Sequence, residues 1–195
     1  MHRRKYLASV CAAGVATTAG CSTVSGSKTL SEPTVNTESS GRKALIFTEN
    51  DEELGHLGVD GSVTSDRIDI TTEVWHRDGT NVESIELRVW MPETAPDTSA
   101  AVAVVSPVEG DSSPPPAVAL KTPDQALGTS IEITDFDDLA DETISTLDLI
   151  VIPGSKTATR LNIHTRIELS GSGTFSSDYK LEGDLQLAYP RLSDK

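Results

Sequence analysis

Residues 67–91 read RIDITTEVWHRDGTNVESIELRVWM, two runs of alternating apolar and polar residues separated by Asp78 and Gly79. Alternation with a period of two is typical of β-strands that bury one face. An Asp-Gly pair between two such runs is a strong signal for a two-residue hairpin turn. We therefore expect an antiparallel hairpin whose core face pairs Ile68 with Val89, Ile70 with Leu87, and Thr72 with Ile85.

The other face of this expected hairpin carries both tryptophans. In the same register Arg67 lies opposite Trp90, which favours a cation–π pair. Trp75 and Trp90 both alternate away from the core face. They form either an exposed aromatic surface for a glycan, a peptide or a partner protein, or a surface covered by a second sheet or by Pro114–Pro116.

A second hairpin is predicted from RLNIHTRIEL at 160–169 and YKLEGDLQLAY at 179–189. One register places opposite charges together: Glu168 with Lys180, Arg166 with Glu182, and His164 with Asp184. A shift by two residues would place like charges opposite each other, which is destabilising. The charge pattern therefore selects the first register.

The chain from residue 42 onward repeats this strand pattern. Short runs rich in Ile, Val, Leu and Thr predict strands at 43–48, 57–64, 67–77, 82–91, 100–106, 117–121, 129–134, 144–152, 160–169 and 179–189. Helical periodicity is absent, apart from one short helical turn expected within 135–143. We expect residues 42–195 to form a single all-β domain, an antiparallel β-sandwich of the immunoglobulin-like type.

The N-terminal residues 3–21, RRKYLASVCAAGVATTAGC, have the order of an export signal. Arg3 and Arg4 give a positive start, an uncharged stretch follows, and small residues precede Cys21. The stretch is shorter than the roughly 20 apolar residues that span a bilayer. We predict that residues 1–20 are a signal peptide that is removed.

Two short motifs in this segment resemble those of known exported proteins. RRKYL at 3–7 resembles the twin-arginine export motif, with Tyr6 where Phe is usual. TAGC at 18–21 resembles a lipobox, with Thr18 where Leu is usual. The resemblance implies lipidation of Cys21 and a membrane anchor facing the outside, which two hydrocarbon chains make stable. The chain is thereby similar to haloarchaeal twin-arginine-exported lipoproteins of unassigned function.

Residues 21–41 are interpreted as the lipidated Cys21 and a tether. The sequence STVSGSKTLSEPTVNTESSG at 22–41 is mostly Ser, Thr, Gly and charged residues, which predicts a flexible, disordered linker. The expected organisation is therefore a signal at 1–20, an anchor and tether at 21–41, and the domain at 42–195.

Composition narrows the classes of partner. The formal net charge is −14, and removal of Arg3, Arg4 and Lys5 with the signal would change it to −17. This acid excess resembles proteins of salt-loving archaea, and the lack of a basic patch argues against nucleic acid as a partner. Cys11 lies within the signal and Cys21 would carry lipid, so no internal disulfide is expected.

Candidate sites for chemistry lack the required spacing. LIVIPGSKT at 149–157 does not match a phosphate loop, and no nucleophile elbow is present. The acidic runs at 50–53 and 135–142 lack the spacing and glycine of a calcium loop. Three of the four histidines, His56, His76 and His164, lie after the signal and lack a zinc-binding spacing.

We therefore expect no cofactor, no metal site and no enzyme. The leading hypothesis is a membrane-anchored, surface-exposed lipoprotein whose β-sandwich is a non-catalytic binding or assembly module. The alternative is an accessory subunit of a membrane transport or respiratory complex. A hydrolase with an unrecognised site is the third hypothesis.

Overall fold

The computed structural model describes residues 26–64, 66–93, 100–109, 117–124, 126–136, 144–155, 157–172 and 177–190. Arg3, Arg4 and Cys21 lie outside these ranges, as do Pro114–Pro116 and residues 137–143 of the segment 135–143 in which a helical turn is expected. The described residues form β1 (Lys28–Leu30), β2 (Thr34–Thr37), β3 (Lys43–Glu49), β4 (Glu52–Val63), β5 (Ile68–His76), β6 (Thr80–Trp90), β7 (Ala101–Glu109), β8 (Ala117–Lys121), β9 (Thr129–Thr134), β10 (Ile144–Ile152), β11 (Arg160–Gly171) and β12 (Tyr179–Ala188).

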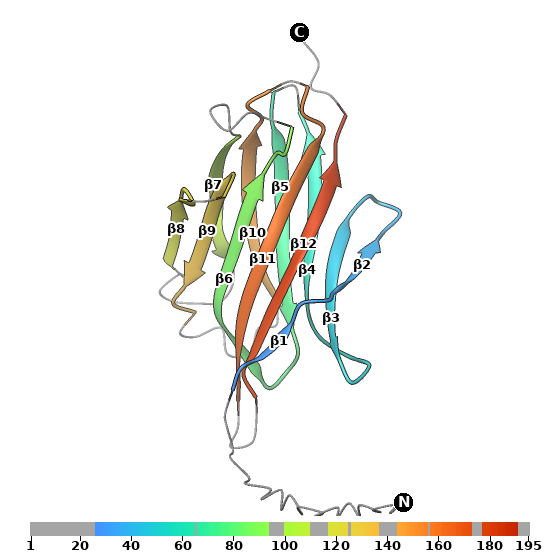
Figure 1. Ribbon diagram of the computed structural model, residues 1–195, viewed down its shortest axis with the longest axis vertical. Coiled ribbons are helices and arrows are strands. Elements are labelled where there is room, and N and C mark those ends of the chain that lie inside the picture. Colours follow the sequence, from blue (N-terminus) through green and yellow to red (C-terminus); the bar gives the residue numbers. More distant parts are fainter. Residues whose placement is uncertain are drawn as a thin grey trace, which may run out of the picture.

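These strands form two packed sheets (Figure 1). Sheet A has the order β1-β12-β11-β6-β9-β8, and sheet B has the order β2-β3-β4-β5-β10-β7. Neighbouring strands are antiparallel except for β1, which runs parallel to β12. Alternate side chains of both sheets, such as Leu57 and Leu161, are buried between them. The prediction of an antiparallel β-sandwich is confirmed.

The strand order is that of an immunoglobulin-like sandwich. Immunoglobulin domains place strands A, B, E and D in one sheet and C, F and G in the other. Taken in chain order as A to G, β4, β5, β6, β7, β10, β11 and β12 give this arrangement. The additional strands β8 and β9 follow β7 in the chain and extend sheet A beside β6. β2 and β3 extend sheet B beyond β4.

Each predicted strand run overlaps an observed strand, with the largest difference at β4. This strand begins at Glu52 rather than at residue 57, because a tight hairpin joins it to β3. Asn50 and Asp51 have φ of 53° and 66°, and positive φ at both central residues defines a type I′ turn. The acidic run at 50–53 is thus a hairpin turn and the start of a strand.

The predicted hairpin between β5 and β6 is wrong. β5 pairs with β4 and β10, whereas β6 pairs with β11 and β9 in the other sheet. Gly79 has φ of +83°, but Asp78 is not among the residues with positive φ, so the turn is not type I′. The chain crosses from sheet B to sheet A at this turn. The apolar faces of β5 and β6 therefore face each other across the core, and the two strands are not neighbours in one sheet. The Arg67–Trp90 pair is also wrong, since Arg67 lies 2.9 Å from Asp69.

The predicted hairpin between β11 and β12 has the predicted register. Glu168 lies opposite Lys180, Arg166 opposite Glu182, and His164 opposite Asp184. The His164–Asp184 pair spans the strands at 3.0 Å. The other charges also pair along their own strands, Arg166 with Glu168 at 2.9 Å and Lys180 with Glu182 at 3.3 Å.

The tether predicted at 22–41 contains two strands, β1 and β2, so the prediction of a flexible linker is wrong at 28–30 and 34–37. β1 pairs with β12 at one edge of sheet A, and β2 pairs with β3 at one edge of sheet B. Both strands are short and mostly exposed, so backbone hydrogen bonds hold them with little side-chain burial. The folded domain therefore begins near residue 27 rather than at residue 42.

Candidate functional site

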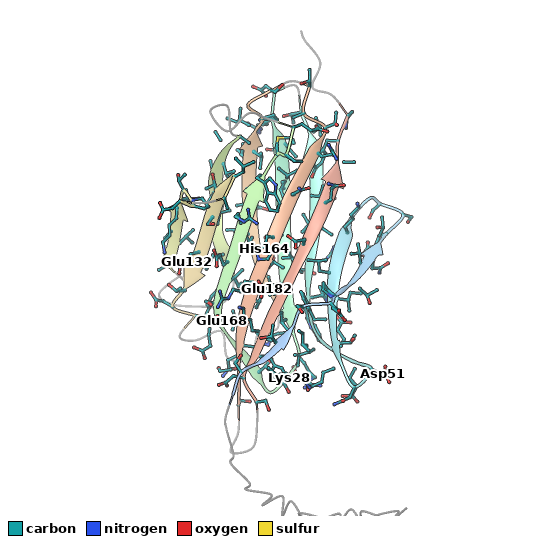
Figure 2. The ribbon with its side chains drawn as sticks, in the orientation of Figure 1. Lys28, Asp51, Glu132, His164, Glu168 and Glu182 are labelled. Carbon is teal, nitrogen blue, oxygen red and sulfur yellow. The ribbon has the colours of Figure 1, made fainter. Side chains whose placement is uncertain are left out.

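The outward side chains of sheet A form rows across the strands. Asn162 on β11 lies opposite Trp90 on β6 and opposite Gln186 on β12, so these three side chains share one row. In the next row His164 lies between Arg88 and Asp184. Figure 2 labels His164, Glu182 and Glu168 on this face. The first row is uncharged, and the rows beyond it are charged.

Trp90 is half-buried, and both Arg88 and Gly128 pack against it. The guanidinium of Arg88 lies 4.2 Å from the centroid of its ring, in a cation–π contact. Beside it, Gly128 has φ of +100°, and a Cβ there would clash with the Val89 carbonyl and with Cβ of Trp90. Only glycine lets this segment approach the end of β6 so closely.

A shallow pocket of ≈ 250 Å³ opens along the uncharged row. It is lined by Trp90, Asn162, Asp184, Leu185 and Gln186. Nε2 of Gln186 donates a 3.0 Å hydrogen bond to Oδ1 of Asn162. A side-chain amide has two N–H donors and two acceptor lone pairs, so this bond uses one position on each amide. Within the described parts of the chain, the structure gives these two side-chain amides no other hydrogen bond, so three positions on each can bind a ligand.

Charged groups border the pocket on one side. Nδ1 of His164 lies 3.0 Å from Asp184, and its Nε2 lies 3.6 Å from Glu182. The carboxylate of Asp184 is exposed, so it also faces solvent and any ligand. The pocket thus combines an aromatic ring, two amides and one carboxylate, which is a set suited to stacking and hydrogen bonding.

Trp75 lies on the outer face of sheet B, away from Trp90. Its ring stacks on His56, with centroids 5.6 Å apart and planes at 17°. His56 lies 2.5 Å from Glu53, and Glu73 accepts a 2.5 Å hydrogen bond from Arg42. The two tryptophans therefore do not form one surface as the predicted hairpin implied. A binding role for each stays a prediction.

A larger groove of ≈ 340 Å³ lies on sheet B, but its carboxylates already have partners within the chain. Asp69 pairs with Arg67 at 2.9 Å, and Asp148 accepts a 2.7 Å hydrogen bond from Thr71. Asp60 accepts a 2.8 Å bond from the backbone of Gly61. These carboxylates stabilise the sheet locally. They leave fewer hydrogen-bonding positions for a ligand than the side-chain amides beside Trp90 do.

The three histidines do not meet. His56 and His164 lie on different sheets, and His76 is buried with Nδ1 3.1 Å from the Thr80 hydroxyl. Among the described residues, no three His, Cys, Asp or Glu side chains come close enough to hold a metal ion. Nor do these parts of the chain contain a helix long and apolar enough to cross a membrane.

Sequence reasoning missed Asn162, Gln186 and Asp184 as neighbours of Trp90. The correct hairpin register already places Asn162 opposite Gln186. What was missing is the pairing of β6 with β11, which joins segments far apart in the chain. The Trp90–Asn162 side of the pocket depends on that pairing.

Comparison with solved structures gives distant alignments at low identity. The collagen-binding domain from a Staphylococcus aureus adhesin aligns with a TM-score of 0.42 at 5% identity, over 67% of this chain and 95% of that chain. The yeast delta-COP-I mu-homology domain complexed with the Dsl1 WxWxV peptide aligns at 0.34 and 11% identity, over 68% and 54%. AvmM, which catalyses macrocyclization in alchivemycin A biosynthesis, aligns at 0.36 and 8% identity, over 84% and 99%. Likeness at this level carries no argument about function.

The sequence itself gives a firmer assignment. A search of curated proteins finds no match to the chain. One family matches residues 27–191, limits that coincide with β1 at one end and the residues after β12 at the other. The match thus covers the whole sandwich, including the two strands that the predicted tether had left out. The chain belongs to the family described as Domain of unknown function (DUF8121).

Proposed function

We propose that the protein is an exported, lipid-anchored binding module that presents the Trp90 pocket at the end of the sandwich remote from its anchor. Lipidation of Cys21 places the anchor a few residues before β1. The pocket supplies the contacts for the ligand, and the sandwich acts as its rigid support.

The observation that carries this proposal is the opposite placement of the chain entry and the pocket. Lys28, the first residue of β1, is labelled in Figure 2. It lies opposite Tyr179 at the start of β12. Gln186 in the pocket lies seven residues further along the same strand. At about 3.3 Å per residue this places the pocket roughly 23 Å from the entry point. A chain anchored before β1 therefore presents the pocket away from the membrane.

Anchoring is tested with Cys21→Ser in the full chain, produced in cells that make the native protein. The wild-type protein is expected in the membrane fraction and accessible to protease added to intact cells. The variant is expected in the medium. A variant that stays in the membrane fraction would contradict the lipid anchor.

Binding is tested by adding the released Cys21→Ser protein to washed cells that lack the native protein. Retention on the cells is expected, with loss in Cys21→Ser/Trp90→Ala and little change in Cys21→Ser/Trp75→Ala. The second variant is a matched control, because it removes the same side chain from the opposite face. Equal retention of both variants would refute the role of the pocket, and stoichiometric purification with membrane subunits would favour an accessory subunit instead.

A further inference from the structure

We infer that the Trp90 pocket binds one uncharged pyranose ring of a glycan. This inference rests on the proposed function, because it names the ligand class for the same pocket. It is argued from the chemistry of the lining residues, their fixed positions and the surrounding charge.

A pyranose ring has two kinds of surface that match the pocket. Its axial C–H groups form an apolar face, which packs against an indole ring such as that of Trp90. Its rim carries hydroxyl groups, each of which both donates and accepts hydrogen bonds. Asn162 and Gln186 offer amide donors and acceptors beside the indole, and the Asp184 carboxylate offers acceptors. An aliphatic ligand would leave these polar groups without partners.

The lining side chains are held in place before a ligand arrives. Gln186 and Asn162 are joined by their 3.0 Å hydrogen bond, and Arg88 lies against Trp90. All of them project from paired strands rather than from loops. Fixed side chains reduce the entropy lost on binding, which matters for a weak ligand such as a sugar.

The size of the pocket suits a single ring. At ≈ 250 Å³ it lies below the range of about 300–1,000 Å³ that encloses a drug-sized molecule. The adjacent row, with His164 and Arg88, continues the exposed face beyond the pocket. One ring thus occupies the pocket while the rest of a glycan extends along the sheet.

The local charges favour an uncharged sugar. Asp184 lines the pocket, and the chain carries a formal net charge of −14. The cationic side chains beside the pocket already have partners, since Arg88 lies on Trp90 and Nζ of Lys43 donates a 2.7 Å hydrogen bond to the backbone carbonyl of Gln186. A uronate or sulfated sugar would bring a further negative charge next to this carboxylate, which is unfavourable.

The test uses Trp75→Phe, in which Trp90 is the only tryptophan and reports on its own pocket. The protein is titrated with maltotriose, cellotriose and mannotriose, and with trigalacturonate as the anionic comparison. Trp90 fluorescence and saturation-transfer NMR of the sugar are recorded. We expect at least one neutral trisaccharide to bind, and the anionic one to bind at least tenfold more weakly.

Three variants locate the binding. Trp90→Ala is expected to lower affinity in the NMR experiment at least tenfold, and Asn162→Ala and Gln186→Ala at least threefold each. Because Asn162 and Gln186 lie at the surface of the sheet, their variants keep the test valid if Trp90→Ala fails to fold. Thr71→Ala, in the groove of sheet B, is the matched control and is expected to bind as wild type.

The outcomes separate the ligand class from the proposed function. If none of the three neutral sugars binds, or if trigalacturonate binds more tightly, the glycan inference is overturned. Retention on cells that still requires Trp90 would then leave the proposed function standing. If neutral sugars bind through Trp90 but cells do not retain the protein, the ligand class holds and the surface role fails.

Discussion

The hydroxyl of Tyr179 on β12 donates a 2.8 Å hydrogen bond to Glu49 on β3, and so joins the two sheets at the end where β1 enters. Lys28 of β1 donates a second hydrogen bond to the same carboxylate. These bonds, that of Lys28 first and that of Tyr179 next, hold the pKa of Glu49 below its usual value. Burial and the hydrogen bond to Glu49 raise the pKa of Tyr179.

Glu49→Gln is expected to lower stability at neutral pH and not in acid. Because the pKa of Glu49 is lower in the folded state, its contribution is present above the unfolded pKa and is lost as pH falls through the folded pKa. We expect a deficit of about 1 kcal/mol at neutral pH, the value of an ordinary hydrogen bond, that disappears once the folded-state carboxyl is protonated. Urea unfolding of the variant and the wild type at a series of pH values measures this difference in the free energy of unfolding.

Tyr179→Phe is the control for this experiment. It removes one hydrogen bond and leaves the Lys28–Glu49 pair in place, so part of the acid dependence is retained. A deficit of Glu49→Gln that stays constant into strong acid would show that the carboxylate charge is not the cause.

Thr165→Val is expected to stabilise the protein. The Thr165 side chain is fully buried on β11, and its hydroxyl has no hydrogen-bond partner among the residues that the structure describes. A buried hydroxyl without a partner costs about 1–3 kcal/mol, and valine has nearly the same shape. We expect a gain of about 1 kcal/mol in urea unfolding with an unchanged m-value, whereas Thr165→Ser would keep the hydroxyl and open a cavity. A loss of stability in the valine variant would show that the hydroxyl has a partner in solution.

Gly128→Ala is expected to destabilise the domain and to disturb the pocket. Both Gly128 and Gly41 have positive φ, at +100° and +96°, but only Gly128 would place a Cβ against Val89 and Trp90. Gly41→Ala should therefore cost only backbone strain, about 1–2 kcal/mol. Gly128→Ala should cost more and shift Trp90 fluorescence in the Trp75→Phe background. Equal free energies of unfolding for the Gly128→Ala and Gly41→Ala variants would contradict the close packing of Gly128 on β6.

Salt is expected to raise stability. A chain of net charge −14 repels itself in dilute buffer, and the Debye length falls from about 30 Å at 0.01 M to about 3 Å at 1 M salt. Thermal unfolding should shift to higher temperature across this range in KCl, with chloride chosen because sulfate also strengthens apolar burial. The same transition midpoint in millimolar and molar KCl would argue against charge repulsion as a limit on stability.

Much of the fold could be predicted because alternation is a local property. Ile68, Ile70, Leu87 and Val89 are all buried as their pattern indicates. The β11–β12 register also followed from nearby information, since charges on two consecutive strands excluded the shifted pairings. The immunoglobulin-like arrangement then followed from the number and spacing of the strands.

Strand partners beyond the hairpin could not be predicted in this way. Asp78-Gly79 and Asn50-Asp51 have similar turn chemistry, yet only the second pair has both residues in the left-handed region. The apolar faces of two consecutive strands become buried whether the strands are neighbours in one sheet or lie in the two facing sheets. The alternation of apolar residues therefore does not distinguish a hairpin from a crossing between the sheets. The pocket at Trp90 depends on the pairing of β6 with β11, and it could not be predicted because that pairing joins segments far apart in the sequence.

β1 also determines how the domain responds to a mechanical pull. Because β1 runs parallel to β12 and the chain enters at Lys28, tension on the preceding residues acts along the strand. The hydrogen bonds between the two strands are then loaded together in shear rather than opened one at a time, and the Lys28–Glu49 pair adds resistance at the point of entry. The three residues of β1 thus transmit force into both sheets at once.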